Sequence, residues 1–292
     1  MKEITILSGK GGTGKTSITA ALASIARDAV FCDNDVDAAD LHLILSPTVR
    51  EEHVFSGGWT ASIDVTSCID CGICTDHCRF DAIHRNSFNN LEINPFKCEG
   101  CRLCERICPV QAISSVRSNN NSWFVSDTRF GTLVHAKMGP GEENSGKLVS
   151  EVRKRARELA KEYNASYVIN DGPPGIGCAA ISSLSGTGMV LMVIEPSVSG
   201  LHDSRRLVEL IDTFSIPTFA LINKYDIHPE ISEEIKLFLK EKSIPLLGEI
   251  PFDKSMVEAM VEGKTIVEFD DKLEISTILK AVWKKLEDFN VL

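Results

Sequence analysis

The chain has 292 residues, of which 43% are hydrophobic and 25% are charged. These values are ordinary for globular proteins and exclude the disordered and collagen-like classes. The formal net charge of −10 argues against nucleic-acid binding, because phosphate contacts need Lys and Arg. The longest apolar runs, such as residues 189–194, are far shorter than the ~20 residues that span a bilayer, and the N-terminus lacks the apolar stretch and cleavage site of a signal peptide. We therefore expect a cytoplasmic protein that has no stable membrane anchor and binds no nucleic acid.

Short apolar segments alternate with amphipathic helical patterns along most of the chain. Strands are expected at residues 3–7, 29–32, 167–170, 189–194, 218–222 and 246–250. Helices are expected at residues 17–27, 146–163, 201–214, 232–242 and 273–289, and loops at residues 119–121 and 139–145. Strands that alternate with helices predict an α/β fold with a mostly parallel sheet flanked by helices. The last helix is expected to pack on the core rather than on a membrane, because its polar face mixes Lys with Glu and Asp.

The alternation stops between about residues 59 and 116, where eight of the ten cysteines lie. This segment is an internal repeat. CIDCGICTDHCRFDAI starts at Cys68, CEGCRLCERICPVQAI starts at Cys98, and all four cysteines match at an offset of 30. We expect a small inserted domain at residues 59–116 of bacterial ferredoxin type, within a larger domain formed by residues 1–58 and 117–292.

A glycine-rich loop follows the first expected strand. Residues 9–16, GKGGTGKT, match the pattern G-x-x-x-x-G-K-[ST], with a strand before the loop and a helix after it. Glycines let the backbone fold tightly, so that successive N–H groups and the helix N-terminus point at phosphate groups. Lys15 would neutralise the β- and γ-phosphates, and the Thr16 hydroxyl would bind Mg²⁺. The residues expected to bind ATP here are Gly9, Lys10, Gly11, Gly12, Thr13, Gly14, Lys15, Thr16 and Ser17.

The loop holds a second lysine, Lys10, which a plain phosphate loop does not require. With this lysine the loop resembles the deviant Walker A loop of the MinD/ParA/Mrp/nitrogenase-iron-protein superfamily. The resemblance implies that Lys10 reaches across an ATP-dependent homodimer to the partner's nucleotide, and that Lys10, Lys15 and Asp35 take part in hydrolysis. It also implies that Asp35 positions or activates the attacking water and that Asp171, at the end of an apolar strand, holds Mg²⁺ through water. The elements that resemble the adenine-recognition residues of the family are Asn223, Pro251 and Asp253.

The two cysteine runs share the spacing C-x2-C-x2-C-x3-C, and a proline follows the second run. This is the run of bacterial ferredoxins with two clusters, in which the fourth cysteine of each run ligates the other cluster. Structural zinc is the alternative, but it usually takes two separated C-x-x-C pairs rather than three cysteines in seven residues. We expect two 4Fe–4S clusters, one held by Cys68, Cys71, Cys74 and Cys108, and the other by Cys98, Cys101, Cys104 and Cys78.

Four further features need an interpretation. Arg79 stands where the second run has Pro109, and its charge and N–H donor are expected to raise the potential of the adjacent cluster. Cys32 is expected in the core. Cys178 lies where the nitrogenase iron protein, which the chain resembles there, has a cluster ligand, but no second cysteine is evident nearby and we favour a packing or interface role. The basic residues 153–157 are either a solvated helix face or a docking patch for an acidic electron carrier.

Nearly all of the chain resembles one branch of this superfamily, the P-loop ATPases that carry an inserted ferredoxin domain. The resemblance implies a homodimeric Mg-ATPase whose nucleotide state is coupled to electron transfer through two 4Fe–4S clusters, with a redox or iron–sulfur protein as a further partner. Two alternatives stay open. One is an iron–sulfur carrier or scaffold of the Mrp type, although no C-x-x-C pair follows Cys108. The other is a positioning ATPase of the MinD or ParA type with structural or sensing clusters.

Overall fold

The computed structural model describes residues 1–139 and 145–289. The chain forms two compact units. Unit 1 comprises residues 1–52, 124–136 and 145–292, and unit 2 comprises residues 53–123 and 137–144. Unit 2 is wider than the segment expected from the cysteine repeat, because the strands that connect the two units add residues at both of its ends. Most of the loop expected at residues 139–145 lies outside the described residues.

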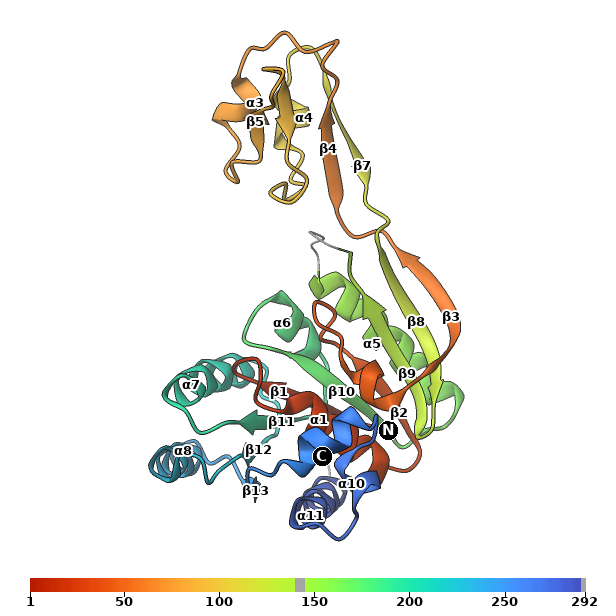
Figure 1. The fold of residues 1–292 in the computed structure, drawn as a ribbon, viewed down its shortest axis with the longest axis vertical. Helices are drawn as coiled ribbons and strands as arrows, with labels where there is room; N and C mark the ends of the chain where they lie inside the picture. Colours follow the sequence, from red (N-terminus) through yellow and green to blue (C-terminus); the bar gives the residue numbers. More distant parts are fainter. Residues whose placement is uncertain (140–144, 290–292) are drawn as a thin grey trace. The chain divides into compact units, whose positions relative to one another are not determined.

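Unit 1 is built on a mostly parallel sheet (Figure 1). Its strands are β1 (Lys2–Ser8), β2 (Ala29–Asp33), β3 (Thr48–Phe55), β8 (Asn121–Thr128), β9 (Gly131–Lys137), β10 (Tyr167–Pro174), β11 (Met189–Ile194), β12 (Thr218–Asn223) and β13 (Leu246–Ile250). They run in the order β13-β12-β11-β1-β10-β2-β9-β8-β3. Every pairing from β13 to β9 is parallel, so the carboxyl ends of these strands, where α/β proteins bind ligands, share one edge.

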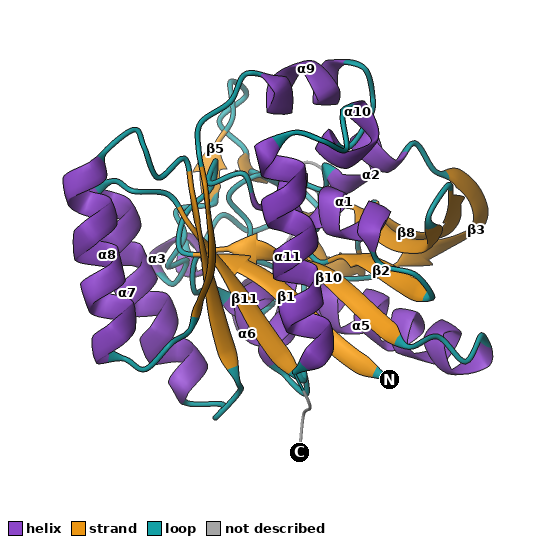
Figure 2. Cartoon of the chain, turned by 90° about the horizontal axis from the view of Figure 1, so that it is seen from below, coloured by secondary structure: helices purple, strands orange, loops and turns teal. Residues whose placement is uncertain are grey.

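Helices cover both faces of this sheet (Figure 2). One face carries α1 (Lys15–Ile25), α2 (Leu41–Leu45), α9 (Ser255–Val261), α10 (Ile266–Phe269) and α11 (Glu274–Asp288). The other face carries α5 (Ser145–Glu162), α6 (Cys178–Leu184), α7 (Val198–Asp212) and α8 (Pro229–Glu241). The expected α/β architecture with a parallel sheet between helices is confirmed.

The central strands are apolar along their whole length because both of their faces are covered. In β11 all six residues are buried. In β1, Ile4 and Ile6 pack against α1 and α11, whereas Leu7 packs against the helices of the opposite face. This double burial fixes the position of the residues that follow β1, β2 and β10 at the carboxyl edge. None of the helices in the two described ranges is long and apolar enough to cross a membrane.

Unit 2 contains two short antiparallel strand pairs and two short helices. The elements are β4 (Trp59–Ile63), α3 (Ile73–Asp76), β5 (Ile83–Arg85), β6 (Leu91–Ile93), α4 (Leu103–Ile107) and β7 (Ile113–Arg117), with β4 paired to β7 and β5 paired to β6. α3 and α4 begin 30 residues apart, as do β5 and β7, so the sequence repeat is also a structural repeat. Its small core contains Ile83, Leu91, Ile93 and Ile113, against which several cysteines pack.

Candidate functional site

A cavity of about 570 Å³ opens at the carboxyl edge of the sheet in unit 1, a size typical of small-molecule sites. The phosphate loop and the start of α1 form one wall, with residues 11–17. Asp35, Asp37 and Asp40, which follow β2, form a second wall. The third wall consists of the end of β10 and the start of α6, where Cys178 is exposed. Ser145, at the start of α5, completes the lining, so residues from four separate chain segments converge on one cavity.

Asp171 of β10 is the centre of the polar contacts beneath the loop. The Lys15 ammonium lies 2.9 Å from Asp171 Oδ1, and the Thr16 hydroxyl donates to Asp171 Oδ2 at 2.7 Å. The Thr19 hydroxyl, one turn further along α1, donates to Asp171 Oδ1 at 2.8 Å. The structure therefore brings Lys15, Thr16 and Asp171 together, as their predicted roles require. The sequence analysis missed Thr19, although it lies four residues after Lys15 and so on the same helix face.

Burial and neighbouring charges set the protonation of the two groups expected to act on the phosphates. Burial lowers the pKa of Lys15, but the carboxylates of Asp171, Asp33 and Asp35 outweigh it and the pKa lies above the ordinary lysine value. Burial raises the pKa of Asp35 to about 6, a rise that Lys15 opposes and that Asp171 and Asp37 reinforce. Lys15 is therefore positively charged, and it lies beside Asp35, whose pKa of about 6 suits a general base.

Lys10 contacts residues at the start of α7. Its Nζ lies 2.9 Å from Ser197 Oγ, 3.5 Å from Ser199 Oγ and 3.8 Å from Glu195 Oε1. Among the residues that the structure describes, Lys10 is not one of those that line the cavity. Its contact with the nucleotide of a partner subunit stays a prediction.

Asn223, at the end of β12, supports the phosphate loop from outside the cavity. Its Nδ2 donates to the Thr13 carbonyl at 2.7 Å. Gly14 has a φ of 86°, and a Cβ at Gly14 would lie 2.4 Å from Asn223 Nδ2. Both the left-handed backbone and the close amide explain why glycine stands here. Gly9 is constrained by space alone, because a Cβ there would lie 2.6 Å from the backbone of Asp203.

Pro251 and Asp253 lie in the loop after β13. The Asp253 carboxylate accepts a hydrogen bond from the Ser255 backbone N–H at 2.8 Å, so it is engaged at the start of α9. Among the described residues, the wall of the cavity does not include Asn223, Pro251 or Asp253. Their contacts with adenine therefore stay a prediction.

The basic run on α5 is only partly at the surface, because Lys154 is exposed whereas Arg153 is buried. Arg153 is only 2% exposed, and its guanidinium pairs with Glu3 of β1 and donates to the Ser185 carbonyl at 3.0 Å. Arg157 lies 2.6 Å from the second carboxylate oxygen of Glu3, and Arg155 pairs with three other glutamates. The buried Glu3 carboxylate requires these cationic partners, which the helical pattern alone does not reveal. Cys32, by contrast, is fully buried as expected.

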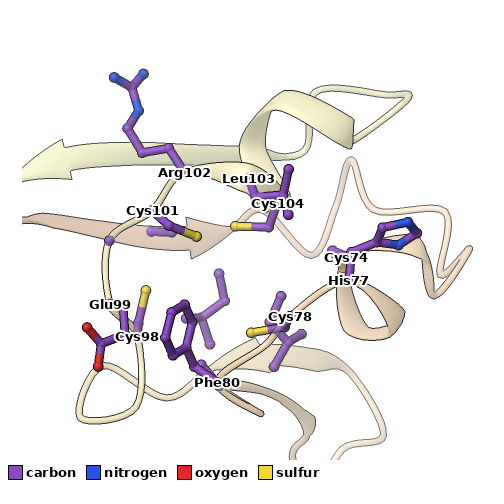
Figure 3. Close-up of a pocket in the computed structure, with 15 residues that line it drawn as sticks. Cys74, His77, Cys78, Phe80, Cys98, Glu99, Cys101, Arg102, Leu103 and Cys104 are labelled. Atoms are coloured by element: carbon purple, nitrogen blue, oxygen red, sulfur yellow. The ribbon is translucent and has the colours of Figure 1, made fainter.

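The eight cysteines of the repeat line two small cavities within unit 2. One cavity is lined by Cys78, Cys98, Cys101 and Cys104, with Cys74 beside them, and Figure 3 shows the first four sulfur atoms turned toward a common space. The other cavity is lined by Cys68, Cys71, Cys74 and Cys108. Each expected ligand set, including the cysteine from the other half of the repeat, therefore lies around one cavity. Across residues 1–139 and 145–289, no three His, Cys, Asp or Glu side chains are arranged to hold a single metal ion.

Comparison with known proteins places the chain in a family. Residues 4–266 match the CobQ/CobB/MinD/ParA nucleotide binding domain. The chain belongs to this family. The uncharacterized protein MJ0578 of Methanocaldococcus jannaschii is 32% identical over 291 residues, which cover 98% of this chain and 97% of the relative. The septum site-determining protein MinD of Synechocystis is 21% identical over 93% of this chain and 84% of the relative.

A solved structure supports the same fold. The Mg-ADP complex of the septum site-determining protein MinD from Pyrococcus horikoshii aligns with a TM-score of 0.58 and 18% identity, over 98% of this chain and 96% of that chain. Family membership and fold together identify unit 1 as a P-loop nucleotide-binding domain. They confirm the predicted superfamily, and they do not bear on the cysteine cavities of unit 2.

Proposed function

We propose that this chain is an Mg-ATP-binding and -hydrolysing iron–sulfur protein that couples the nucleotide state of a homodimer to electron transfer through two 4Fe–4S clusters. The observation that supports the proposal is that each of two small cavities is lined by one complete ligand set of four repeat cysteines, with Cys74 lining both cavities. The same chain contains the phosphate-loop cavity of a nucleotide-binding family. Nucleotide binding and cluster binding are thus combined in one polypeptide.

The nucleotide chemistry follows from the contacts beneath the loop. Loop N–H groups, the start of α1 and the Lys15 ammonium would bind the phosphates. The Thr16 hydroxyl would hold Mg²⁺ directly, and the Asp171 carboxylate, which lies 2.7 Å from that hydroxyl, would hold it through water. Asp35, on the facing wall of the cavity, accepts a proton from the attacking water. The raised pKa of Asp35 suits this role.

The donor chemistry of unit 2 fits two 4Fe–4S groups. Such a group takes one thiolate per iron, so its four ligands surround a space rather than a single point, in agreement with the two cavities. Burial, reinforced by the nearby thiols of Cys98, Cys101 and Cys74, raises the pKa of the Cys104 thiol to about 11. Thiolates held in this environment need a compensating positive charge, which iron provides. When bound, the clusters would supply one-electron transfer.

In the proposed homodimer, Lys10 contacts the nucleotide of the partner subunit. The change Lys10→Ala should leave nucleotide binding largely intact and abolish hydrolysis, because its ammonium is assigned to the phosphates of the partner subunit rather than to those bound by its own loop. Nucleotide affinity and phosphate release measured on the same preparation test this. Hydrolysis at the wild-type rate would rule out the trans role of Lys10.

Iron and sulfide analysis tests the cluster assignment. After anaerobic reconstitution, the chain should contain about eight iron atoms and eight acid-labile sulfides, as two 4Fe–4S clusters require. The changes Cys71→Ser and Cys104→Ser should each remove about half of both, because each affects one ligand set. Cys178→Ser is the matched control, since Cys178 lies outside both cavities, and it should retain the full content. Retention of one or two zinc ions in place of iron would refute the proposal.

A positioning ATPase is the second candidate, because septum site-determining MinD proteins are among the relatives that cover most of this chain. In that case the clusters would be structural or sensing groups. ATP-dependent binding to liposomes, together with electron-transfer rates that do not respond to nucleotide, would favour this candidate over the first.

A further inference from the structure

Within unit 2, one of the two cysteine loops rests on the first residue of β4. We call residues 68–74 the first-cluster loop and residues 98–104 the second-cluster loop. A Cβ at Gly100 would lie 3.0 Å from the Trp59 backbone nitrogen and would collide with the Trp59 carbonyl. The Arg102 guanidinium lies 4.1 Å from the centre of the Trp59 ring, within the range of cation–π contacts. The second-cluster loop thus contacts Trp59 through both its backbone and a side chain.

Arg102 makes its contact from a backbone conformation that glycine would adopt more readily. Its φ is 61°, in the left-handed region that is uncommon for other residues. The matched position in the first-cluster loop, 30 residues earlier, is Gly72, with a φ of 75°. Figure 3 shows the Arg102 side chain turned away from the cysteine sulfur atoms. Such residues are retained where surrounding contacts fix them, here the Trp59 ring and the Glu105 carboxylate, which lies 2.8 Å from Arg102 Nε.

The matched positions of the first-cluster loop are used differently. A Cβ at Gly72 would meet no atom within 4 Å. Asp70, which takes the place of Gly100 in the repeat, pairs with Arg85 of β5 at 2.8 Å, and β5 pairs with β6. These contacts tie the first-cluster loop to a strand pair inside unit 2.

Trp59 belongs to the paired segments through which the chain enters and leaves unit 2. It pairs with Arg117 across β4 and β7, and the Ser118 N–H donates to the Gly58 carbonyl at 3.0 Å. Beyond these residues the chain continues into β3 on one side and β8 on the other, which are neighbours in the sheet. Hydrogen-bonded segments therefore lead from the sheet to the residue on which the second-cluster loop rests.

The strand β3 also follows the wall of the nucleotide cavity along the chain. Asp35, Asp37 and Asp40 line that cavity, α2 begins directly after Asp40, and α2 leads into β3. Asp33 fixes both ends of this wall, because its carboxylate accepts hydrogen bonds from the backbone N–H groups of Asp35 and Leu41, each at 3.1 Å. A change in the wall on nucleotide binding would thus be passed through α2 and β3 to Trp59.

These contacts distinguish the two clusters of the proposed function. The second cluster is the one assigned to Cys98, Cys101, Cys104 and Cys78, and the first cluster is the other. We propose that Trp59 and Arg102 are positioning residues that transmit the nucleotide state to the second cluster and not to the first. Cluster potentials depend on hydrogen bonds to the sulfurs and on solvent exposure, and a displaced loop changes both. The proposal rests on the proposed function, in which the chain binds a nucleoside triphosphate and two 4Fe–4S clusters.

The test is an anaerobic redox titration of the reconstituted full-length protein, monitored by electron paramagnetic resonance, without nucleotide and with a non-hydrolysable ATP analogue. Cys71→Ser, which keeps only the second cluster, should show the nucleotide-dependent shift in midpoint potential of the wild type. Cys104→Ser, which keeps only the first cluster, should show none. A shift in Cys104→Ser overturns the proposal but leaves coupling intact. A wild type that does not respond to nucleotide refutes the coupling and this inference together.

Variants of the contact separate positioning from charge. Arg102→Gly supplies the residue of the matched position, which suits the backbone there, so the protein should keep about eight iron atoms and lose the shift. Trp59→Leu leaves the loop sequence unchanged and should have the same effect, whereas Arg102→Lys keeps a cation for the ring and should retain most of the shift. Arg106→Ala is the matched control, an exposed arginine of α4 that lines neither cavity. A shift that survives in Arg102→Gly and Trp59→Leu, or that is also lost in Arg106→Ala, overturns the roles of both residues.

Iron loss to a chelator tests the contact without nucleotide. Arg102→Gly and Trp59→Leu should each speed the loss of about half of the iron by about two- to fivefold, as expected from a cation–π contact at an exposed site. The other half should leave at the wild-type rate. Unchanged loss of both halves would show that the contact does not hold the loop, and it would overturn the proposal. A wild-type protein that binds no iron refutes the proposed function and this inference with it.

Discussion

Replacing Asp35 with Asn should stabilise the nucleotide-free protein at pH 8 and remove its hydrolytic activity. The Asp35 side chain is 15% exposed and lies 3.9 Å from the Lys15 ammonium. Burial, with help from Asp171 and Asp37, outweighs this cation and raises the pKa of Asp35 to about 6. The native fold therefore disfavours the ionised form of Asp35, which the reaction needs. Ionised Asp35 thus lowers stability, and this loss is tolerated because the residue is needed for function.

The magnitude follows from the pKa. A rise from the ordinary value of 3.8 to about 6, at 1.36 kcal/mol per pKa unit, corresponds to at most about 3 kcal/mol at pH 8. The sign follows from proton binding, because the native state binds the proton of Asp35 more tightly than the unfolded chain does. The contribution of Asp35 to stability is thus fully present below pH about 4 and is lost as the pH rises through about 6. Asparagine resembles the neutral acid and avoids this loss.

Thermal unfolding followed by far-UV circular dichroism is the assay. At pH 8 the melting temperature of Asp35→Asn should exceed that of the wild type by on the order of 5 °C, given about 2–4 °C per kcal/mol for a domain of this size. The difference should fall toward zero at pH 4. Asp40→Asn, an exposed carboxylate on the same cavity wall, is the control and should change little. A destabilised Asp35→Asn, or a difference that does not depend on pH, would refute the reasoning.

Three further predictions concern activity and packing. In the wild type, kcat/KM for hydrolysis should decline below pH about 6, because this ratio reports the free enzyme and Asp35 must be ionised; a flat profile down to pH 5 would argue against Asp35 as the base. Gly14→Ala and Gly12→Ala both place a side chain at positive φ, a strain of about 1–2 kcal/mol. Only Gly14→Ala also displaces the Asn223 amide, so this variant should have the lower melting temperature. Equal losses in the two variants would contradict the contact between Gly14 and Asn223. Arg153→Gln should cost about 3–5 kcal/mol in a urea titration because it leaves the Glu3 carboxylate buried without its main cation, and adding Glu3→Gln should restore part of this loss. No recovery in the double variant would show that the ion pair is not the cause.

Local sequence patterns predicted the phosphate loop and the central strands, because each depends on residues that are close in sequence. The buried strands around β11 are continuous apolar runs, and the glycine-rich loop must follow one of them. The edge strand β3, TVREEHVF, was not predicted, because its residues are half-buried or exposed and it lacks the apolar alternation of a core strand.

Contacts between distant segments account for what the sequence could not show. Arg153 looks like a surface residue on its helix, yet it is buried because Glu3, 150 residues earlier in the chain, needs a partner. The amide of Asn223 donates to the Thr13 carbonyl, a contact that the sequence did not reveal, while its contact with adenine stays a prediction. In both cases the side chain supplies a hydrogen-bonding partner to another segment, and such partners follow from the fold rather than from spacing.

The central claim is that nucleotide state changes the properties of the clusters. An anaerobic redox titration monitored by electron paramagnetic resonance tests it most directly, with the protein free of nucleotide, with ADP, and with a non-hydrolysable ATP analogue. Coupling predicts a nucleotide-dependent shift of tens of millivolts or a changed cluster spectrum, where about 59 mV corresponds to a tenfold change in a one-electron equilibrium. Three superimposable titrations with unchanged spectra would contradict the coupling of cluster potential to nucleotide state.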